Sequence, residues 1–286
     1  MPDIKQIPAL INLLDEPDEM IFNRIREQLL AIGNPALAPL GTALENTFDP
    51  GLRERIQGII RKINLETVCG ELAEWRHKGS EDLLRGFILV TRTNNPDLKE
   101  EEVIVAIEQL RMDIWVELHE NLTALENVKV INHVLFHIQH FEGNVQSLSE
   151  PQNSYINTVL ETRKGNSLSL GMLYMILAQR LQLPIFGVNL PQHFILAYLT
   201  DYGIVNPTEN DVLFYINPFT QGAVFTRREI ELFIRQLKVK PDRTFFTPCT
   251  HVDIIRRLIH NLIFSYNQIG DPEIPEDLKN LLKVLE

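Results

Sequence analysis

Three polar residues in an otherwise apolar stretch have the types and the order that acyl-transfer chemistry needs. Ser167 opens the segment SLSLGMLYMILAQRL, His193 begins the apolar run HFILAYL, and Asn217 ends the run DVLFYIN. A hydroxyl that attacks a carbonyl, an imidazole that takes its proton and a side chain that orients the imidazole form a nucleophile–base–orienter triad. The sequence therefore offers Ser167, His193 and Asn217 as candidate catalytic residues, with Ser169 as an alternative nucleophile.

This trio combines two weak choices for catalysis. A serine must lose its proton during attack, and the imidazolium that forms is best stabilised by a carboxylate. Replacing aspartate by asparagine in a Ser–His–Asp triad costs about 10⁴ in turnover, which corresponds to roughly 5.5 kcal/mol. We therefore expect a degenerate, non-catalytic site, and we keep amide or ester hydrolysis, or acyl transfer, by Ser167, His193 and Asn217 as the alternative.

Each of these residues also has a structural explanation. Ser167 or Ser169 can cap the helix that follows, by accepting backbone N–H bonds. His193 can be a core histidine hydrogen-bonded to Asn217, or it can belong to a pocket that binds a small ligand or a peptide. Asn217 and Pro218 can simply form the turn that ends a strand.

The elements that must position these residues are a helix followed by three strands. SLSLGMLYMILAQRL predicts a buried helix, and the β-branched and aromatic runs PIFGVNL, HFILAYL and DVLFYINPF predict strands. Polar turns at 201–203 and 206–211 favour antiparallel connections. Residues 66–142 predict mostly helices, and helices are also expected over TRREIELFIRQL and THVDIIRRLIHNLIFSYNQIG, the latter with a capping box between Thr250 and Asp253.

These motifs, taken in order, resemble a known family. NSYINTVLETRKGNSLSLGMLYMILAQRLQLPIFGVNLPQHFILAYL and YINPFTQG are similar to the second core class of the transglutaminase-like superfamily, the bacterial SirB-one group. FEGN at 141–144 and RRLIHNLIFSYNQ at 256–268 share the likeness, which covers roughly residues 66–270. The resemblance implies a papain-like core. It aligns four residues with the glycine, cysteine, histidine and aspartate of the catalytic members, in that order: Gly165, Ser167, His193 and Asn217. Ser167 and Asn217 therefore differ from the residues found in the catalytic members.

Residues 1–64 show a different pattern, which is typical of stacked helix pairs. Apolar side chains at helical spacing mark four successive helical segments. The second and fourth segments have matching sequence patterns, in which Ile21 corresponds to Leu52 and Ile25 to Ile56. The segment resembles HEAT-like repeats, and an unrelated pair of helical hairpins is the alternative.

The predicted fold class is therefore α+β and mostly helical. We expect HEAT-like helical repeats over residues 1–64 and a transglutaminase-like core with its leading helices and a small antiparallel sheet over 66–248. A C-terminal helical arm over 250–286 resembles the start of a tetratricopeptide-type repeat. Since repeat helices typically offer extended binding faces, we expect a protein or peptide partner, bound through the degenerate Ser–His–Asn site and the helical repeats.

Patterns for metals and cofactors are weaker. His133, His137 and His140 have helical spacing, and imidazoles on one helix face can bind zinc, but no acidic ligand stands in register, so a half-exposed polar face is the favoured interpretation. Cys69 and Cys249 are the two cysteines and stand far apart, which argues against a disulfide framework or a structural zinc site. Because a Gly-rich phosphate loop is also absent, we expect no cofactor and no metal.

Composition limits the class of partner. The net charge is −11, which argues against binding to nucleic acid or to an anionic membrane surface. The sequence shows neither a signal-peptide pattern nor an uncharged apolar run near the ~18–20 residues of a membrane span. We expect a cytoplasmic protein that builds an ordinary core from its 44% hydrophobic residues.

Overall fold

The N-terminal part of the chain is a small helical unit with its own core. The computed structural model describes residues 4–204 and 207–286, so Asn206 of the second predicted turn lies outside it. The unit contains α1 (Ile7–Ile11), α2 (Glu19–Ile32), α3 (Leu37–Asn46) and the first half of α4 (Pro50–His77). Asp18 and Asp49 cap α2 and α4 by accepting backbone N–H bonds. Leu29, Leu40 and Ile59 are completely buried in the centre of this unit.

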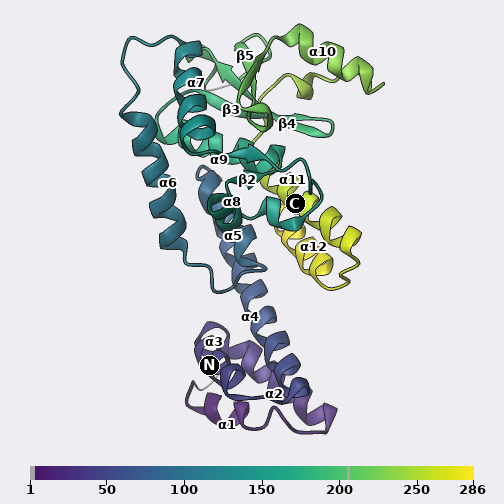
Figure 1. The fold of residues 1–286 in the computed structure, drawn as a ribbon. Coiled ribbons are helices and arrows are strands. Elements are labelled where there is room, and N and C mark those ends of the chain that lie inside the picture. Colours follow the sequence, from purple (N-terminus) through teal and green to yellow (C-terminus); the bar gives the residue numbers. More distant parts are fainter. Residues whose placement is uncertain (1–3, 205–206) are drawn as a thin grey trace.

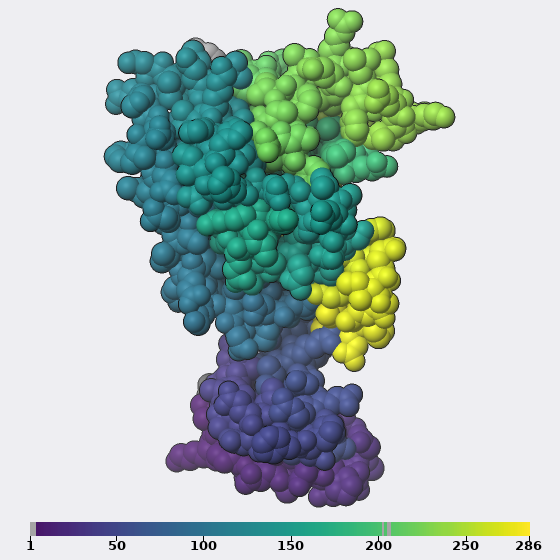
Figure 2. Space-filling view, in the orientation of Figure 1, coloured from purple at the N-terminus to yellow at the C-terminus, as the bar shows by residue number. Residues whose placement is uncertain are grey.

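Helix α4 joins the N-terminal unit to the rest of the molecule. We predicted the boundary between the repeats and the core near residue 65, and one helix, Pro50–His77, runs across it. Asn64, Leu65 and Glu66 include neither glycine nor proline, so nothing interrupts the backbone hydrogen bonds there. Within α4 the buried side chains pass from the N-terminal cluster to the main core between Ile63 and Leu65. Figure 2 shows the N-terminal helices as a separate lobe of the molecule.

The main body is mostly helical and contains one four-stranded sheet, which confirms the predicted α+β class. Its leading helices are α5 (Leu83–Arg92), α6 (Glu100–Trp115), α7 (Ala124–Asn132), which continues into a π-helical segment (His133–Ile138), and α8 (Ile156–Thr162). A short parallel pair, β1 (Glu142–Gly143) and β2 (Lys164–Gly165), then leads into α9 (Ser167–Arg180). After the sheet come α10 (Arg227–Gln236), α11 (His251–Ile269) and α12 (Ile274–Leu285).

The sheet consists of consecutive antiparallel strands in the order β3-β4-β5-β6. The predicted strands are β3 (Ile185–Leu190), β4 (His193–Leu199) and β5 (Val212–Asn217), while β6 (Ala223–Phe225) was missed. In Figure 1 the sheet lies between α9 and α10. Because side chains alternate along a strand, Phe194, Leu196 and Tyr198 face the main core with α9, whereas Ile195, Ala197 and Leu199 pack with α10. Strand β4 is thus apolar on both faces.

Candidate functional site

The N-terminus of α9 is capped by Asn166, one residue before the serine that the sequence analysis favoured. The Asn166 Oδ1 atom accepts the backbone N–H groups of Leu168 and Ser169, each at 2.9 Å. In return Ser169 Oγ accepts the Asn166 N–H at 3.0 Å, which completes a capping box. Ser169 is therefore fully buried and committed to the cap, whereas Ser167 is a half-buried first helical residue that does not cap the helix.

His193 begins strand β4 and shares the face of Ile195, which packs with α10. Its ring meets the ring of Phe233 from α10 edge to face, with 5.3 Å between the centroids. The Nδ1 atom is buried and has no hydrogen-bond partner within the described part of the chain. Arg257 of α11 also lies next to this residue: it donates hydrogen bonds to the His193 backbone oxygen at 2.8 Å and to Asn189 Oδ1 at 3.0 Å.

These surroundings favour a neutral imidazole. Burial of the ring lowers the pKa of His193, and the nearby positive charge of Arg257 lowers it further. No carboxylate shifts the pKa in the opposite direction. At neutral pH the side chain is therefore an uncharged group with one buried nitrogen that lacks a partner.

Asn217 ends β5 on the same face of the sheet. Tyr215 packs with the α10 cluster and Ile216 with the main core, so strand alternation directs Asn217 toward α10. Its Oδ1 atom accepts the backbone N–H of Phe219 at 3.1 Å and so caps the turn Pro218–Thr220. Among the hydrogen bonds of the described residues there is none between His193 and Asn217, so the interpretation of a histidine bonded to Asn217 was wrong.

His193 and Asn217 nevertheless share one pocket. It has a volume of about 190 Å³ and lies between the sheet and α10. Most of the remaining lining is apolar, with Glu229 as its single carboxylate: Leu190, Ile195, Phe225, Glu229, Ile230 and Phe233.

Ser167 lies on the helix that covers the opposite face of the sheet. Ser167 and Gly171 are four residues apart on α9 and therefore share a side of that helix. The residue of β4 that meets this side is Phe194, because a Cβ atom added to Gly171 would lie 2.5 Å from the Phe194 ring. The structure thus brings His193 and Asn217 together in one pocket, and Ser167 is not among the residues that line it.

The three histidines before this region do not share a regular helix face. The segment His133–Ile138 is π-helical, and His140 follows it with a left-handed backbone (φ 58°). The rings of His133 and His137 are 6.0 Å apart between centroids. A cluster of three or more potential metal ligands is absent from residues 4–204 and 207–286.

The two cysteines are not activated nucleophiles. Burial raises the pKa of the Cys69 thiol. Burial also raises the pKa of the Cys249 thiol to about 12, and its Sγ atom donates a hydrogen bond to the Gly187 oxygen at 3.2 Å. Both thiols therefore remain protonated at neutral pH.

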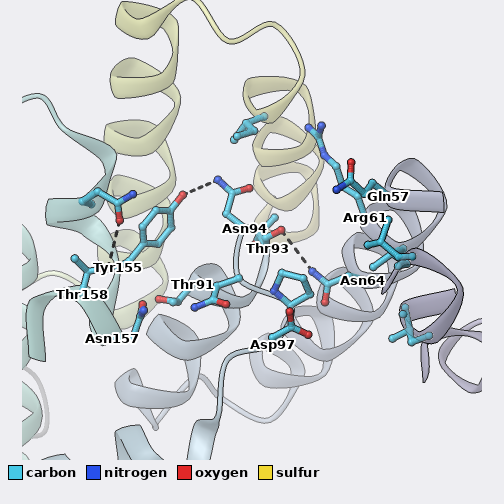
Figure 3. Close-up of a pocket in the computed structure, with 18 of the residues that line it drawn as sticks. Gln57, Arg61, Asn64, Thr91, Thr93, Asn94, Asp97, Tyr155, Asn157 and Thr158 are labelled. Atoms are coloured by element: carbon cyan, nitrogen blue, oxygen red, sulfur yellow. Dashed lines mark hydrogen bonds between the residues drawn. The ribbon is translucent and has the colours of Figure 1, made fainter. Parts of the chain in front are cut away.

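A second hollow, which the sequence analysis missed, lies between the N-terminal unit and the main body. This groove has a volume of about 960 Å³ and is lined from α3, α4 and the turn after α5, together with residues near α8. Figure 3 shows amide, hydroxyl and aliphatic side chains converging on it. The one local signal in the sequence is Asn94-Asn95-Pro96, which by itself indicates only the end of a helix.

Comparison with known proteins places the main body in a family. A family model described as the transglutaminase-like superfamily matches residues 101–260. A UPF0162 protein of Xylella fastidiosa (strain 9a5c) is 27% identical over 190 residues, which cover 64% of this chain and 64% of that protein. A UPF0162 protein of Pseudomonas aeruginosa is 29% identical over 139 residues, which cover 48% of this chain and 47% of the relative.

A third relative matches a shorter part of this chain. F-box only protein 21 of Mus musculus is 33% identical over 106 residues, which cover 37% of this chain and 17% of the mouse protein. The chain thus spans less than two thirds of the length of each of these three relatives. No solved structure matches the chain. Among the described residues, no helix is both long and apolar enough to cross a membrane.

Proposed function

This chain belongs to the transglutaminase-like superfamily, and from that membership we propose that it is a non-catalytic member that binds a protein or peptide partner. The observation that carries the proposal is the position of His193, in a pocket against α10 rather than against the helix that bears Ser167. Helix α9 covers one face of the sheet, and His193 points to the other face, toward α10.

Acyl transfer requires closer contact than this arrangement gives. A nucleophile and its base must come within hydrogen-bond reach, at about 2.6–3.2 Å between heavy atoms. Phe194 occupies the side of β4 that faces α9, so the imidazole next to it is directed away from the Ser167 hydroxyl. Asn217 does not orient the base either: its Oδ1 atom caps the turn at Phe219, and no hydrogen bond joins it to His193 among the described residues.

The pocket around His193 has the properties of a binding site for one side chain. An unpaired buried polar group costs roughly 1–3 kcal/mol, which a ligand recovers if it donates a hydrogen bond to His193 Nδ1 or accepts one from it. The pocket volume of about 190 Å³ compares with the engineered apolar cavity of ~150 Å³ that binds benzene. An aromatic or aliphatic side chain of a partner therefore fits it.

The flanking helices support the same function. We infer that residues 1–64 are HEAT-like repeats, whose stacked helices typically present extended binding faces. The match to F-box only protein 21 covers 17% of that protein, so a segment similar to part of this chain also occurs within a much larger protein. A segment used in this way suits an assembly role better than a free-standing hydrolase.

Covalent labelling separates this proposal from the hydrolase alternative. We expect a fluorophosphonate probe to label the native chain no more than it labels Ser167→Ala. We also expect a reporter ester to be hydrolysed no faster by the native chain than by that variant. Labelling of Ser167 that disappears in His193→Ala would establish the Ser167–His193–Asn217 enzyme instead.

The proposed binding of a protein or peptide partner needs a separate measurement. A tagged native chain should retain a protein partner from a lysate of its source cells, and His193→Ala should retain at least several-fold less of it. Equal retention by both chains would remove the His193 pocket from the proposal.

A further inference from the structure

The groove between the N-terminal unit and the main body has one wall of amide side chains. Asn94 and Asn95 contribute to it from the turn after α5, and Asn157 contributes from α8. All three are half-buried. The Oδ1 atom of Asn157 is buried and has no partner within the described residues. Asn94 Nδ2 donates to the hydroxyl of Tyr155 at 2.7 Å (Figure 3). It also donates to the hydroxyl of Tyr266 at 2.7 Å, and the two bonds fix the amide with its carbonyl oxygen still available.

The opposite wall is aliphatic. Leu37 and Leu44 of α3 and Ile60 of α4 line the groove, and they pack against the buried cluster of the N-terminal unit. All three are half-buried. This wall therefore offers apolar contact from a fixed surface on which further side chains can pack.

The charges at the groove argue against an anionic ligand. Arg61 is the one cation among its lining residues, and it already forms ion pairs with Glu273 and with Asp277 of α12. Glu45 and Asp97 add two exposed carboxylates. A phosphate or nucleotide would meet these negative charges without an available positive partner.

The geometry points to an extended, uncharged or basic peptide segment of a protein partner as the occupant of this groove. Amide side chains carry a donor and an acceptor together, as a peptide backbone does. An extended chain also directs alternate side chains to opposite sides, so its backbone can pair with the amide wall while aliphatic side chains contact Leu37 and Ile60.

This inference rests on the proposed binding function and names the kind of partner segment involved. Two glycines allow a sharp test. Gly41 of α3 lines the groove, Gly70 of α4 does not, and each has empty space where a Cβ atom would stand. Both are helical, so replacing either glycine is not expected to weaken its helix. Gly41→Phe fills the groove, and Gly70→Phe is the matched control.

The experiment selects peptides from a random phage-displayed library on the native full-length chain and measures their affinities by fluorescence polarisation. We expect enriched peptides that bind Gly41→Phe at least tenfold more weakly than the native chain, and Gly70→Phe equally well. Asn157→Ala should weaken binding about three- to tenfold, as expected for one lost hydrogen bond. Asn121→Ala, at an exposed turn outside the groove, should have no effect.

A stability measurement distinguishes a lost contact from a damaged fold. Because Asn157 Oδ1 is buried without a partner, Asn157→Ala should unfold at the same or a higher urea concentration than the native chain. A lower midpoint, a library that yields no peptide sensitive to Gly41→Phe, or equal binding by both phenylalanine variants would overturn the groove assignment. Peptides that respond to His193→Ala but not to Gly41→Phe would overturn it while leaving the proposed function intact. Labelling of Ser167 would overturn the function itself.

Discussion

At the scale of single residues, the direction of one imidazole decides what chemistry is available. His193 is in contact with the Phe233 ring and beside the Arg257 guanidinium, and its Nδ1 atom is buried without a partner among the residues that the structure describes. A general base in a triad has a hydroxyl on one nitrogen and an orienting group on the other. His193 has neither, so it can offer a partner one hydrogen bond inside an apolar pocket.

The depressed pKa of His193 predicts a pH-dependent stability. In the unfolded chain the imidazole has its ordinary pKa of about 6.5, and burial together with Arg257 lowers the pKa in the folded chain. The unfolded state therefore binds this proton more tightly, and stability falls as the pH drops below about 6.5 towards the folded-state value. We expect the urea midpoint to fall between pH 7 and pH 5 by more in the native chain than in His193→Gln.

The comparison between the two chains isolates this group. Glu229, the carboxylate of the pocket, has its pKa lowered by hydrogen bonds from Thr226 and stays ionised over this range. Other titrating groups contribute equally to both chains. An identical loss of stability in the native chain and in His193→Gln would contradict a neutral, buried His193.

At the scale of elements, the close packing of helix α9 on the sheet depends on the Phe194 ring, which lies between Gly171 of α9 and Gly187 of β3. A Cβ atom added to Gly171 of α9 would lie 2.5 Å from the Phe194 ring, and one added to Gly187 of β3 would lie 2.4 Å from it. Such distances leave no room for a methyl group. The close approach sets the phase of β4, with Phe194 toward α9 and His193 away from it.

This packing predicts that substitutions at Gly171 and Phe194 have coupled effects on the free energy of unfolding. Gly171→Ala should lower the free energy of unfolding by about 1–3 kcal/mol, because the added methyl group overpacks the interface. In the background of Phe194→Leu, the same change should cost less, since a smaller side chain can make room. Urea denaturation of the native chain, both single variants and the double variant measures this coupling, and additive effects would contradict it.

The helices and strands were predictable where the signal is local. The β-branched runs gave β3, β4 and β5, and the Thr250–Asp253 capping box is present at the start of α11. The face on which His193 lies was not predictable, because β4 is apolar on both faces, and alternation alone does not say which face meets α9.

The groove was missed for a related reason. Its walls come from residues as far apart as Leu37 and Tyr266, which meet only after folding.

At the scale of the whole molecule, one long helix connects two hydrophobic cores. Helix α4 contributes Ile56 and Ile59 to the N-terminal cluster and Val68 and Leu72 to the main core. The ion pair of Arg61 with Asp277, at 2.6 Å, adds a link between the N-terminal half of α4 and α12. The groove lies at this junction, so the stability of the N-terminal unit controls one of its walls.

Separate cores predict that the N-terminal unit can be destabilised alone. Leu29 is completely buried in the N-terminal cluster, and Leu29→Ala should cost about 2–5 kcal/mol there. Both tryptophans, Trp75 and Trp115, lie outside this cluster. Fluorescence therefore follows the main body, whereas far-UV circular dichroism follows all helices. We expect Leu29→Ala to lose part of its helical signal at a lower urea concentration than the one at which its fluorescence changes.

The matched control is Leu258→Ala, which removes an equally buried side chain from α11 in the main core. This variant should shift the fluorescence transition by a similar free energy, about 2–5 kcal/mol. Coincident transitions by the two probes in Leu29→Ala would mean that α4 couples both cores into one cooperative unit. In that case the groove walls could not move independently. Separate transitions would instead mean that a peptide bound in the groove stabilises the N-terminal unit, and the first transition should then shift to higher urea as the concentration of a selected peptide rises.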